Sequence, residues 1–306
     1  MKKKLSVTIG IPAYNEGTNI DFLLNDISRQ KKVSYFVSKL IIVSDGSTDN
    51  TVNEAKKSKI KLKLIVNKIR KGLANVQNTI IKYTYSDVLV LLQADIRIND
   101  AFFIEKLIKP IIEEKADLVV PSVCEMKPKT FFEKALYVSA KIKNIAYEKI
   151  NNGRNVYTCR GIARAFSKNL YSEINFPISV GEDAFSYLYC IKNGFDYYFV
   201  NDAKVIFRLP TNFSDHRKQS LRFFQSQQIL KEEFGKKLIK ENYRLPISIL
   251  LASLIENLIK NPFLTSFYII VLFYLKFQSF FLNDINDKWV VSKSSKVVKN
   301  VQEESL

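Results

Sequence analysis

The first 120 residues alternate short apolar runs with amphipathic segments, and this alternation constrains the fold more than any other feature of the sequence. The apolar runs predict strands at 5–11, 40–43, 62–66 and 87–92, and a fifth strand that begins at residue 118. The segments between them repeat apolar residues at helical spacing. Because strands that alternate with helices are typical of a parallel sheet, we expect an α/β domain with a mostly parallel central sheet.

The alternation stops after residue 120, and longer helices follow. The pattern predicts a long aromatic-rich helix over 130–150, another around 182–192 and a basic one around 215–233. The second part of the chain therefore differs in architecture from the first.

The region 245–282 is apolar. Residues 245–255 form a short apolar run, and residues 263–282 form a longer one in which Lys276 is the one charged residue. Since a membrane-spanning helix needs about 20 mostly apolar residues, 263–282 predicts a single span. An interfacial helical hairpin and a buried pair of soluble helices are the alternatives.

Lysine and arginine number 47 against 30 aspartate and glutamate, a net charge of +17. Such a charge favours an anionic partner, although a lysine-rich solvated surface also accounts for it. No nucleic-acid-binding signature is present, so we expect no nucleic acid partner. Three widely spaced cysteines fit neither a disulfide framework nor a zinc site, which favours a reducing, cytosolic location.

Polar residues follow the first two predicted strands, at the sheet edge where α/β proteins bind ligands. Residues 12–16 read Pro-Ala-Tyr-Asn-Glu, in which Tyr14 can stack on a base and Glu16 can bond a base or ribose. A plain turn is the alternative. After the second strand, Gly46 permits close backbone approach and Asp45 can hold a base or ribose. A helix cap explains Asp49 but not Asp45.

Charged residues also follow the third and fourth strands. Arg70 and Lys71 begin a helix and can neutralise a diphosphate, or they are simply a solvated helix start. Asp95 ends an all-apolar strand, where a bare carboxylate is costly to bury. Mg²⁺ or Mn²⁺ shared with a diphosphate is a natural partner, and pairing with Arg97 is the alternative.

In this order the motifs resemble those of the family 2 glycosyltransferases, which have a GT-A nucleotide-binding fold. The matching segments are 12–16, 45–49 (Asp-Gly-Ser-Thr-Asp), 71–73 (Lys-Gly-Leu) with Asn78, 94–95 (Ala-Asp), 181–183 (Gly-Glu-Asp) and 219–223 (Gln-Ser-Leu-Arg-Phe). Together they span Leu5 to Phe223. Each segment is common, but the ordered set is specific.

The resemblance implies an inverting, metal-dependent, hexosyltransferase-type enzyme. The implied nucleotide-binding residues are Pro12, Tyr14, Glu16, Asp45, Arg70 and Lys71. Asp95 would bind Mg²⁺ or Mn²⁺, and Asp183 would be the general base. Glu182, Gln219 and Arg222 would hold the acceptor or the diphosphate, and His216 would be a metal ligand or a gating residue.

The chain departs from the family pattern at several positions. Ser44 stands where a second acid is usual, and Gln93 and Arg97 stand where further acids often flank the metal-binding aspartate. Phe223 replaces a tryptophan. These differences bear on the donor more than on the reaction class.

The resemblance divides the chain into four parts. These are a nucleotide-sugar-binding half (1–120), an acceptor-binding and catalytic half (121–235), a membrane-associated hairpin or span (236–282) and a polar tail (283–306). We expect a nucleotide-sugar donor and a lipid-linked or glycan acceptor that offers a hydroxyl or phosphate. The apolar segment puts the enzyme at the cytosolic face of the cell membrane.

Two other functions are open to this sequence. A non-catalytic membrane- or nucleotide-binding protein can keep a glycosyltransferase-like fold. A sugar nucleotidyltransferase would need a glycine-rich loop after the first strand, where this chain has Pro-Ala-Tyr-Asn-Glu.

Overall fold

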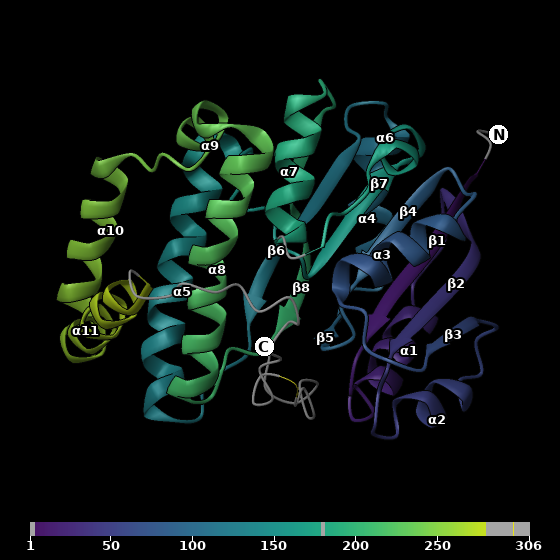
Figure 1. Ribbon diagram of the computed structural model, residues 1–306, viewed down its shortest axis with the longest axis horizontal. Helices are drawn as coiled ribbons and strands as arrows, with labels where there is room; N and C mark the ends of the chain where they lie inside the picture. Colours follow the sequence, from purple (N-terminus) through teal and green to yellow (C-terminus); the bar gives the residue numbers. More distant parts are fainter. Residues whose placement is uncertain (1–3, 179–180, 280–295, 297–306) are drawn as a thin grey trace.

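The computed structural model describes residues 4–178, 181–279 and 296 (Figure 1). The N-terminal part builds four parallel strands, as the alternation predicts. They are β1 (Leu5–Ala13), β2 (Tyr35–Asp45), β3 (Lys63–Asn67) and β4 (Val88–Leu92). β1 lies between β2 and β4, and β3 is the outer neighbour of β2. All four therefore end at the same edge of the sheet.

The rest of the sheet is mixed, so the expectation of a mostly parallel sheet is wrong beyond β4. The remaining strands are β5 (Ile96–Arg97), β6 (Leu118–Glu125), β7 (Ala163–Ser167) and β8 (Tyr197–Phe207), and the order is β3-β2-β1-β4-β7-β6-β8-β5. β7 is antiparallel to both β4 and β6, and β5 is antiparallel to β8. Gln93 N donates to Ile162 O, so the chain enters β7 from the edge where β4 ends and must run the opposite way.

Helices cover both faces of the sheet. α1 (Ile20–Ser28), α2 (Thr51–Lys56) and α4 (Phe103–Ile112) contribute to one core, and α3 (Leu73–Lys82), α6 (Lys168–Glu173), α7 (Glu182–Lys192), α8 (Phe213–Phe234) and α9 (Lys236–Asn242) to the other. In β4, Val90 faces the first core and Leu91 the second. This strict alternation explains why β4 is apolar throughout.

The long helix α5 (Phe131–Lys149) agrees with the prediction for 130–150. Thr130 Oγ1 accepts a hydrogen bond from Glu133 N, and Glu133 Oε2 accepts one from Thr130 N. This reciprocal capping box fixes where α5 begins.

Helices α5, α8, α10 (Ile247–Lys260) and α11 (Pro262–Ser279) gather at one end of the sheet, opposite β1–β3 (Figure 1). In the described part of the chain α11 is the one helix long and apolar enough to cross a membrane, which is weak evidence for a span. One of its faces packs on α5 and α8 through Thr265, Tyr268, Val271 and Leu275. Residues 280–282 of the predicted span and the tail 283–306, except Lys296, lie outside the described residues.

Candidate active site

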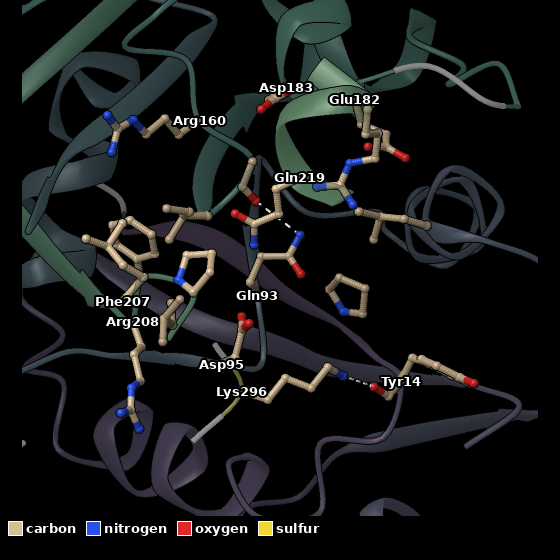
Figure 2. Close-up of a pocket in the computed structure, with 18 of the residues that line it drawn as sticks. Tyr14, Gln93, Asp95, Arg160, Glu182, Asp183, Phe207, Arg208, Gln219 and Lys296 are labelled. Carbon is tan, nitrogen blue, oxygen red and sulfur yellow. Dashed lines mark hydrogen bonds between the residues drawn. The ribbon is translucent and has the colours of Figure 1, made fainter. Parts of the chain in front are cut away.

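One pocket of about 520 Å³ opens where β1, β2 and β4 end, and α5, α8 and α11 form its far side. Eleven of the twelve predicted site residues line it: Pro12, Tyr14, Glu16, Asp45, Arg70, Asp95, Glu182, Asp183, His216, Gln219 and Arg222. Figure 2 shows Tyr14, Asp95, Asp183 and Gln219 around this space. The exception is Lys71, whose exposed side chain does not line the pocket.

Tyr14 and Arg70 form the part of the pocket next to β1. The guanidinium carbon of Arg70 lies 4.1 Å from the centre of the Tyr14 ring. Gly46 makes this approach possible: its φ is +68°, and a Cβ there would lie 2.7 Å from Arg70 N. The close backbone approach predicted for Gly46 is therefore confirmed, and it brings the loop after β3 to the end of β1.

Asp45 organises the same loop. Its carboxylate accepts hydrogen bonds from Lys71 N (2.8 Å), Gly72 N (2.8 Å) and Asn67 Nδ2 (3.0 Å). Asp45 thus holds the turn that leads into α3, and it also lines the pocket. At Lys71, the backbone amide contributes to this arrangement and the side chain points elsewhere.

Asp95 is not neutralised by Arg97. Arg97 Nε lies 2.7 Å from Asp26 Oδ2, and both side chains are buried. The Asp95–Arg97 pairing considered from the sequence is therefore excluded. Burial raises the pKa of Asp95, although the Lys296 charge acts in the opposite direction. A carboxylate in this setting is suited to binding a cation.

Lys296 supplies a cation at the same place. Its Nζ lies 2.5 Å from Glu16 Oε1 and donates to Asn15 O (3.2 Å) and to Tyr14 O (Figure 2). Burial, and then the Asp95 charge, raise the pKa of Glu16 to about 7, while Lys296 opposes the shift. No sequence pattern singles out Lys296, which is one lysine among many.

The donor set fits a divalent metal held together with a substrate. Among the described residues no three His, Cys, Asp or Glu side chains form a cluster that could hold a metal ion alone. Mg²⁺, however, is typically bound by one or two carboxylates together with phosphate oxygens and water. The Asp95 and Glu16 carboxylates lie close enough for the Asp95 charge to raise the pKa of Glu16, and the Lys296 ammonium already lies beside Glu16, so the pair matches that requirement.

At the start of α7, Glu182 and Asp183 differ in environment. Asp183 accepts a hydrogen bond from Ala184 N (2.8 Å) and faces the pocket. Burial, and then the Asp183 charge, raise the pKa of Glu182 to about 8, although Arg164 and Arg222 oppose the shift. Glu182 is therefore mostly protonated at pH 7. Arg164 is fully buried, and its Nη1 donates to Glu182 O (2.7 Å).

The far wall of the pocket holds residues that the sequence did not single out. Lys143 from α5 donates to Tyr268 Oη of α11 at 2.7 Å, and Arg160 also lines the pocket. Burial, and then the Lys143 charge, lower the pKa of His216 to about 4, so its imidazole is neutral at pH 7. The ligand role and the gating role of His216 both stay predictions.

Residues 8–174 match the family model of Glycosyl transferase family 2, which is more than half of the chain, and the chain belongs to this family. No curated protein matches the sequence.

Three solved structures share the fold. The mannosyltransferase PcManGT from Pyrobaculum calidifontis, in complex with GDP-Man and Mn²⁺, is 16% identical, with a TM-score of 0.62 over 91% of this chain and 84% of that one. Glucosyl-3-phosphoglycerate synthase from Mycobacterium tuberculosis, with Mg²⁺ and UDP, is 19% identical, with a TM-score of 0.56 over 76% and 80%. S. aureus TarS 1-349 with UDP is 18% identical, with a TM-score of 0.54 over 74% and 65%. The chain is thus a glycosyltransferase with a GT-A-like fold.

Proposed function

We propose that this chain transfers a sugar from a nucleoside-diphosphate donor to an acceptor at a membrane surface, with inversion and with Mg²⁺ or Mn²⁺. The observation that carries the proposal is that Asp95 and Asp183, from different elements, line one pocket of about 520 Å³. A volume of this size suits a nucleotide sugar and part of an acceptor. The fold neighbours bound to GDP-Man or UDP with Mn²⁺ or Mg²⁺ support the donor class.

The donor would bind across the ends of the parallel strands. Tyr14 offers its ring to the base, and Arg70, stacked on Tyr14, offers its charge to the diphosphate. Asp95, with help from Glu16, would hold the metal. When bound, the metal would neutralise charge that develops on the departing diphosphate.

Asp183 would act at the acceptor side. An acceptor oxygen attacks the anomeric carbon while the bond from that carbon to the diphosphate breaks. Where the attacking group is a hydroxyl, the Asp183 carboxylate takes its proton. Attack opposite the leaving group inverts the configuration, and the products are the glycosylated acceptor and a nucleoside diphosphate.

The C-terminal helices support a membrane location. α11 exposes Phe263 (85%), Ile270 (68%) and Phe273 (71%), and α10 exposes Ile259 (76%). The other face of α11 packs on α5 and α8. We therefore infer that α10 and α11 lie in the plane of the membrane and do not cross it. The cytosolic face agrees with the free cysteines, of which Cys159 and Cys190 are buried.

The test uses the full chain in detergent with Mn²⁺ or Mg²⁺ and a panel of nucleotide sugars. One donor should release nucleoside diphosphate. We expect Asp183→Asn to lower kcat by about 10²–10⁴-fold, the usual contribution of a general base. Asp95→Asn should lower kcat/KM by at least about 10²-fold, since the metal supplies several kcal/mol.

Asp202→Asn is the matched control, because Asp202 is exposed on β8 outside the pocket. Full activity of all three variants, or no release with any donor even when membrane lipid is added, would favour the non-catalytic binding protein. Pyrophosphate release from a nucleoside triphosphate and a sugar phosphate would instead indicate a nucleotidyltransferase.

A further inference from the structure

Lys143 is a cation in the pocket that has no acidic partner among the described residues. Its Nζ donates to Tyr268 Oη (2.7 Å) and lies 4.7 Å from the centre of that ring. The groups that act on its charge are the hydroxyls of Tyr268 and Tyr147 and the positive charge of Arg160. A second cation therefore adds to the positive potential around Lys143.

Three other cations that line the pocket lie beside acids. Arg160 Nη1 lies 3.6 Å from Glu125 Oε1, and Arg208 Nη2 lies 3.0 Å from Glu133 Oε1. Lys296 Nζ lies 2.5 Å from Glu16 Oε1. Lys143 differs from these three cations, because its hydrogen-bond partner, the Tyr268 hydroxyl, is neutral.

An ammonium placed in a pocket without a counter-charge is costly, and the cost falls when an anion binds beside it. Burial alone would lower the pKa of Lys143, but the two tyrosine hydroxyls hold it above its ordinary value. The group is therefore charged at neutral pH. Tyr268 orients the ammonium and adds a second hydrogen-bonding group at the same spot.

The position of Lys143 assigns this charge to the acceptor and not to the donor. α5 and α11 lie at the end of the sheet opposite β1–β3 (Figure 1), whereas Tyr14 and Arg70 come from loops at β1 and β3. α11 carries Tyr268 on its inner face and Phe263, Ile270 and Phe273 on its outer face. The side of the pocket that holds the Lys143 ammonium is therefore also the side next to the exposed apolar face of α11.

We propose that Lys143, oriented by Tyr268, binds a phosphate group of the acceptor. The proposal rests on the proposed function, since it names the acceptor class of the same pocket. A phosphate of a lipid headgroup and a phosphate of a water-soluble acceptor offer the same chemistry to this site. The exposed face of α11 leads us to expect the lipid.

The test compares acceptors that differ only in phosphate. The soluble pair is glycerol 3-phosphate and glycerol, and the lipid pair is phosphatidic acid and diacylglycerol in vesicles, with polyprenyl phosphate vesicles as a third lipid arm. We measure calorimetric binding and, with the active donor, transfer. The phosphate-bearing member should bind at least about 10-fold more tightly, as expected for a hydrogen bond to a charged group. Tighter binding in the vesicle arms identifies a lipid source, and tighter binding of glycerol 3-phosphate identifies a soluble one.

Three variants distinguish phosphate binding by Lys143 from a purely structural role of the Lys143–Tyr268 contact. Lys143→Met should raise the acceptor Kd and KM by about 10- to 100-fold and leave the donor KM unchanged. Tyr268→Phe keeps the ammonium but removes the hydroxyl that orients it, and should raise the acceptor KM by only about 3- to 10-fold, less than Lys143→Met does. Lys141→Met is the matched control, because Lys141 is exposed on the same helix and does not line the pocket.

Equal binding of the phosphate-bearing and phosphate-free acceptors would overturn the proposal. Equal losses in Lys143→Met and Tyr268→Phe would also overturn it, since they would make the pair only a brace between α5 and α11. The calorimetric measurement of acceptor binding does not require transferase activity. Phosphate binding that depends on Lys143 in a chain without transferase activity would therefore support the subsite while the proposed function fails.

Discussion

Glu182 and Asp183 are neighbours in the sequence but differ in protonation. Glu182 is enclosed by Arg164 from β7 and Arg222 from α8, and one of its oxygens has no hydrogen-bond partner among the described residues. Desolvation outweighs the two guanidinium charges, so the carboxyl keeps its proton at neutral pH. A protonated carboxyl can donate a hydrogen bond to a substrate oxygen, which an ionised one cannot.

This difference predicts a pH effect on stability. The pKa of Glu182 rises from 4.5 to about 8 on folding, so the native state binds the extra proton between these values. The free energy of unfolding should therefore fall as pH rises from 4.5 to 8, by at most about 1.4 kcal/mol per pH unit from this group. Glu182→Gln should remove that part of the slope in urea titrations at pH 5, 6.5 and 8.

The exposed Glu173 provides the control, because Glu173→Gln should leave the slope as in the wild type. Parallel slopes in Glu182→Gln and the wild type would mean that Glu182 is ionised in the folded protein.

Lys296 predicts a competition at the donor end. Its ammonium bonds Glu16 and the backbone oxygens of Tyr14 and Asn15, next to Asp95. A metal–nucleotide complex brings its own positive charge to these groups, so Lys296→Met should lower the Kd for Mn²⁺ with nucleoside diphosphate by about 3- to 10-fold. Calorimetry measures this, with Lys4→Met as a control far from the pocket lining. A weaker affinity in Lys296→Met would show instead that Lys296 contacts the diphosphate.

At this scale the residues predicted from the sequence, except Lys71, line one pocket, but the sequence did not indicate all their partners. Arg97 pairs with Asp26, 71 positions away, and no local spacing indicates that choice over Asp95. Asp45 was interpreted as a nucleotide ligand, whereas its carboxylate is bonded to the turn before α3. Lys71 matched a motif through its position, yet only its backbone serves the loop. A motif predicts where the chain goes more reliably than where a side chain points.

Among the elements, α11 combines two surfaces with different tasks. Thr265, Tyr268, Val271 and Leu275 are buried against α5 and α8, and the opposite face is exposed and apolar. A face of this kind partitions into the boundary between lipid headgroups and acyl chains.

Membrane binding should therefore depend on the exposed face. Ile270→Ser combined with Phe273→Ser should lower the partition coefficient for anionic lipid vesicles by about 30- to 1000-fold, since each apolar side chain contributes roughly 1–2 kcal/mol. Vesicle co-sedimentation measures the change. Ile69→Ser is the control, because Ile69 is exposed to a similar extent (71% against 68% for Ile270) but lies in the loop after β3. Unchanged partitioning of the double variant would rule out α11 as the contact.

Element prediction succeeded where the pattern was regular and failed where polar residues interrupt it. The strands β1–β4 and the helices α5 and α7 agree with the sequence prediction. β7 was missed because Arg164 is the second residue of a five-residue strand that is buried throughout. β8 was missed because residues 201–204 are mostly polar and exposed, although the strand runs from Tyr197 to Phe207. Tertiary packing decides such segments, and no local pattern shows it.

For the whole molecule, the sequence predicted a nucleotide-binding α/β domain followed by helices, and the family match agrees with it. It did not predict that the apolar C-terminal helix closes the pocket. The Lys143–Tyr268 contact joins residues 125 positions apart. From hydropathy alone, the segment that contains Tyr268 was predicted to associate with the membrane. The composition of a helix does not indicate which of its faces packs on elements that are distant in the sequence.

The double role of α11 also limits how the chain can be shortened for biochemical work. Ending the chain before Pro262 would remove the apolar face that makes such a protein difficult to handle in water. The same cut would delete Tyr268 from the pocket and expose the sides of α5 and α8 that α11 now covers. Solubility is better sought by changing Phe263, Ile270 and Phe273 individually, since their side chains face away from the reaction chamber.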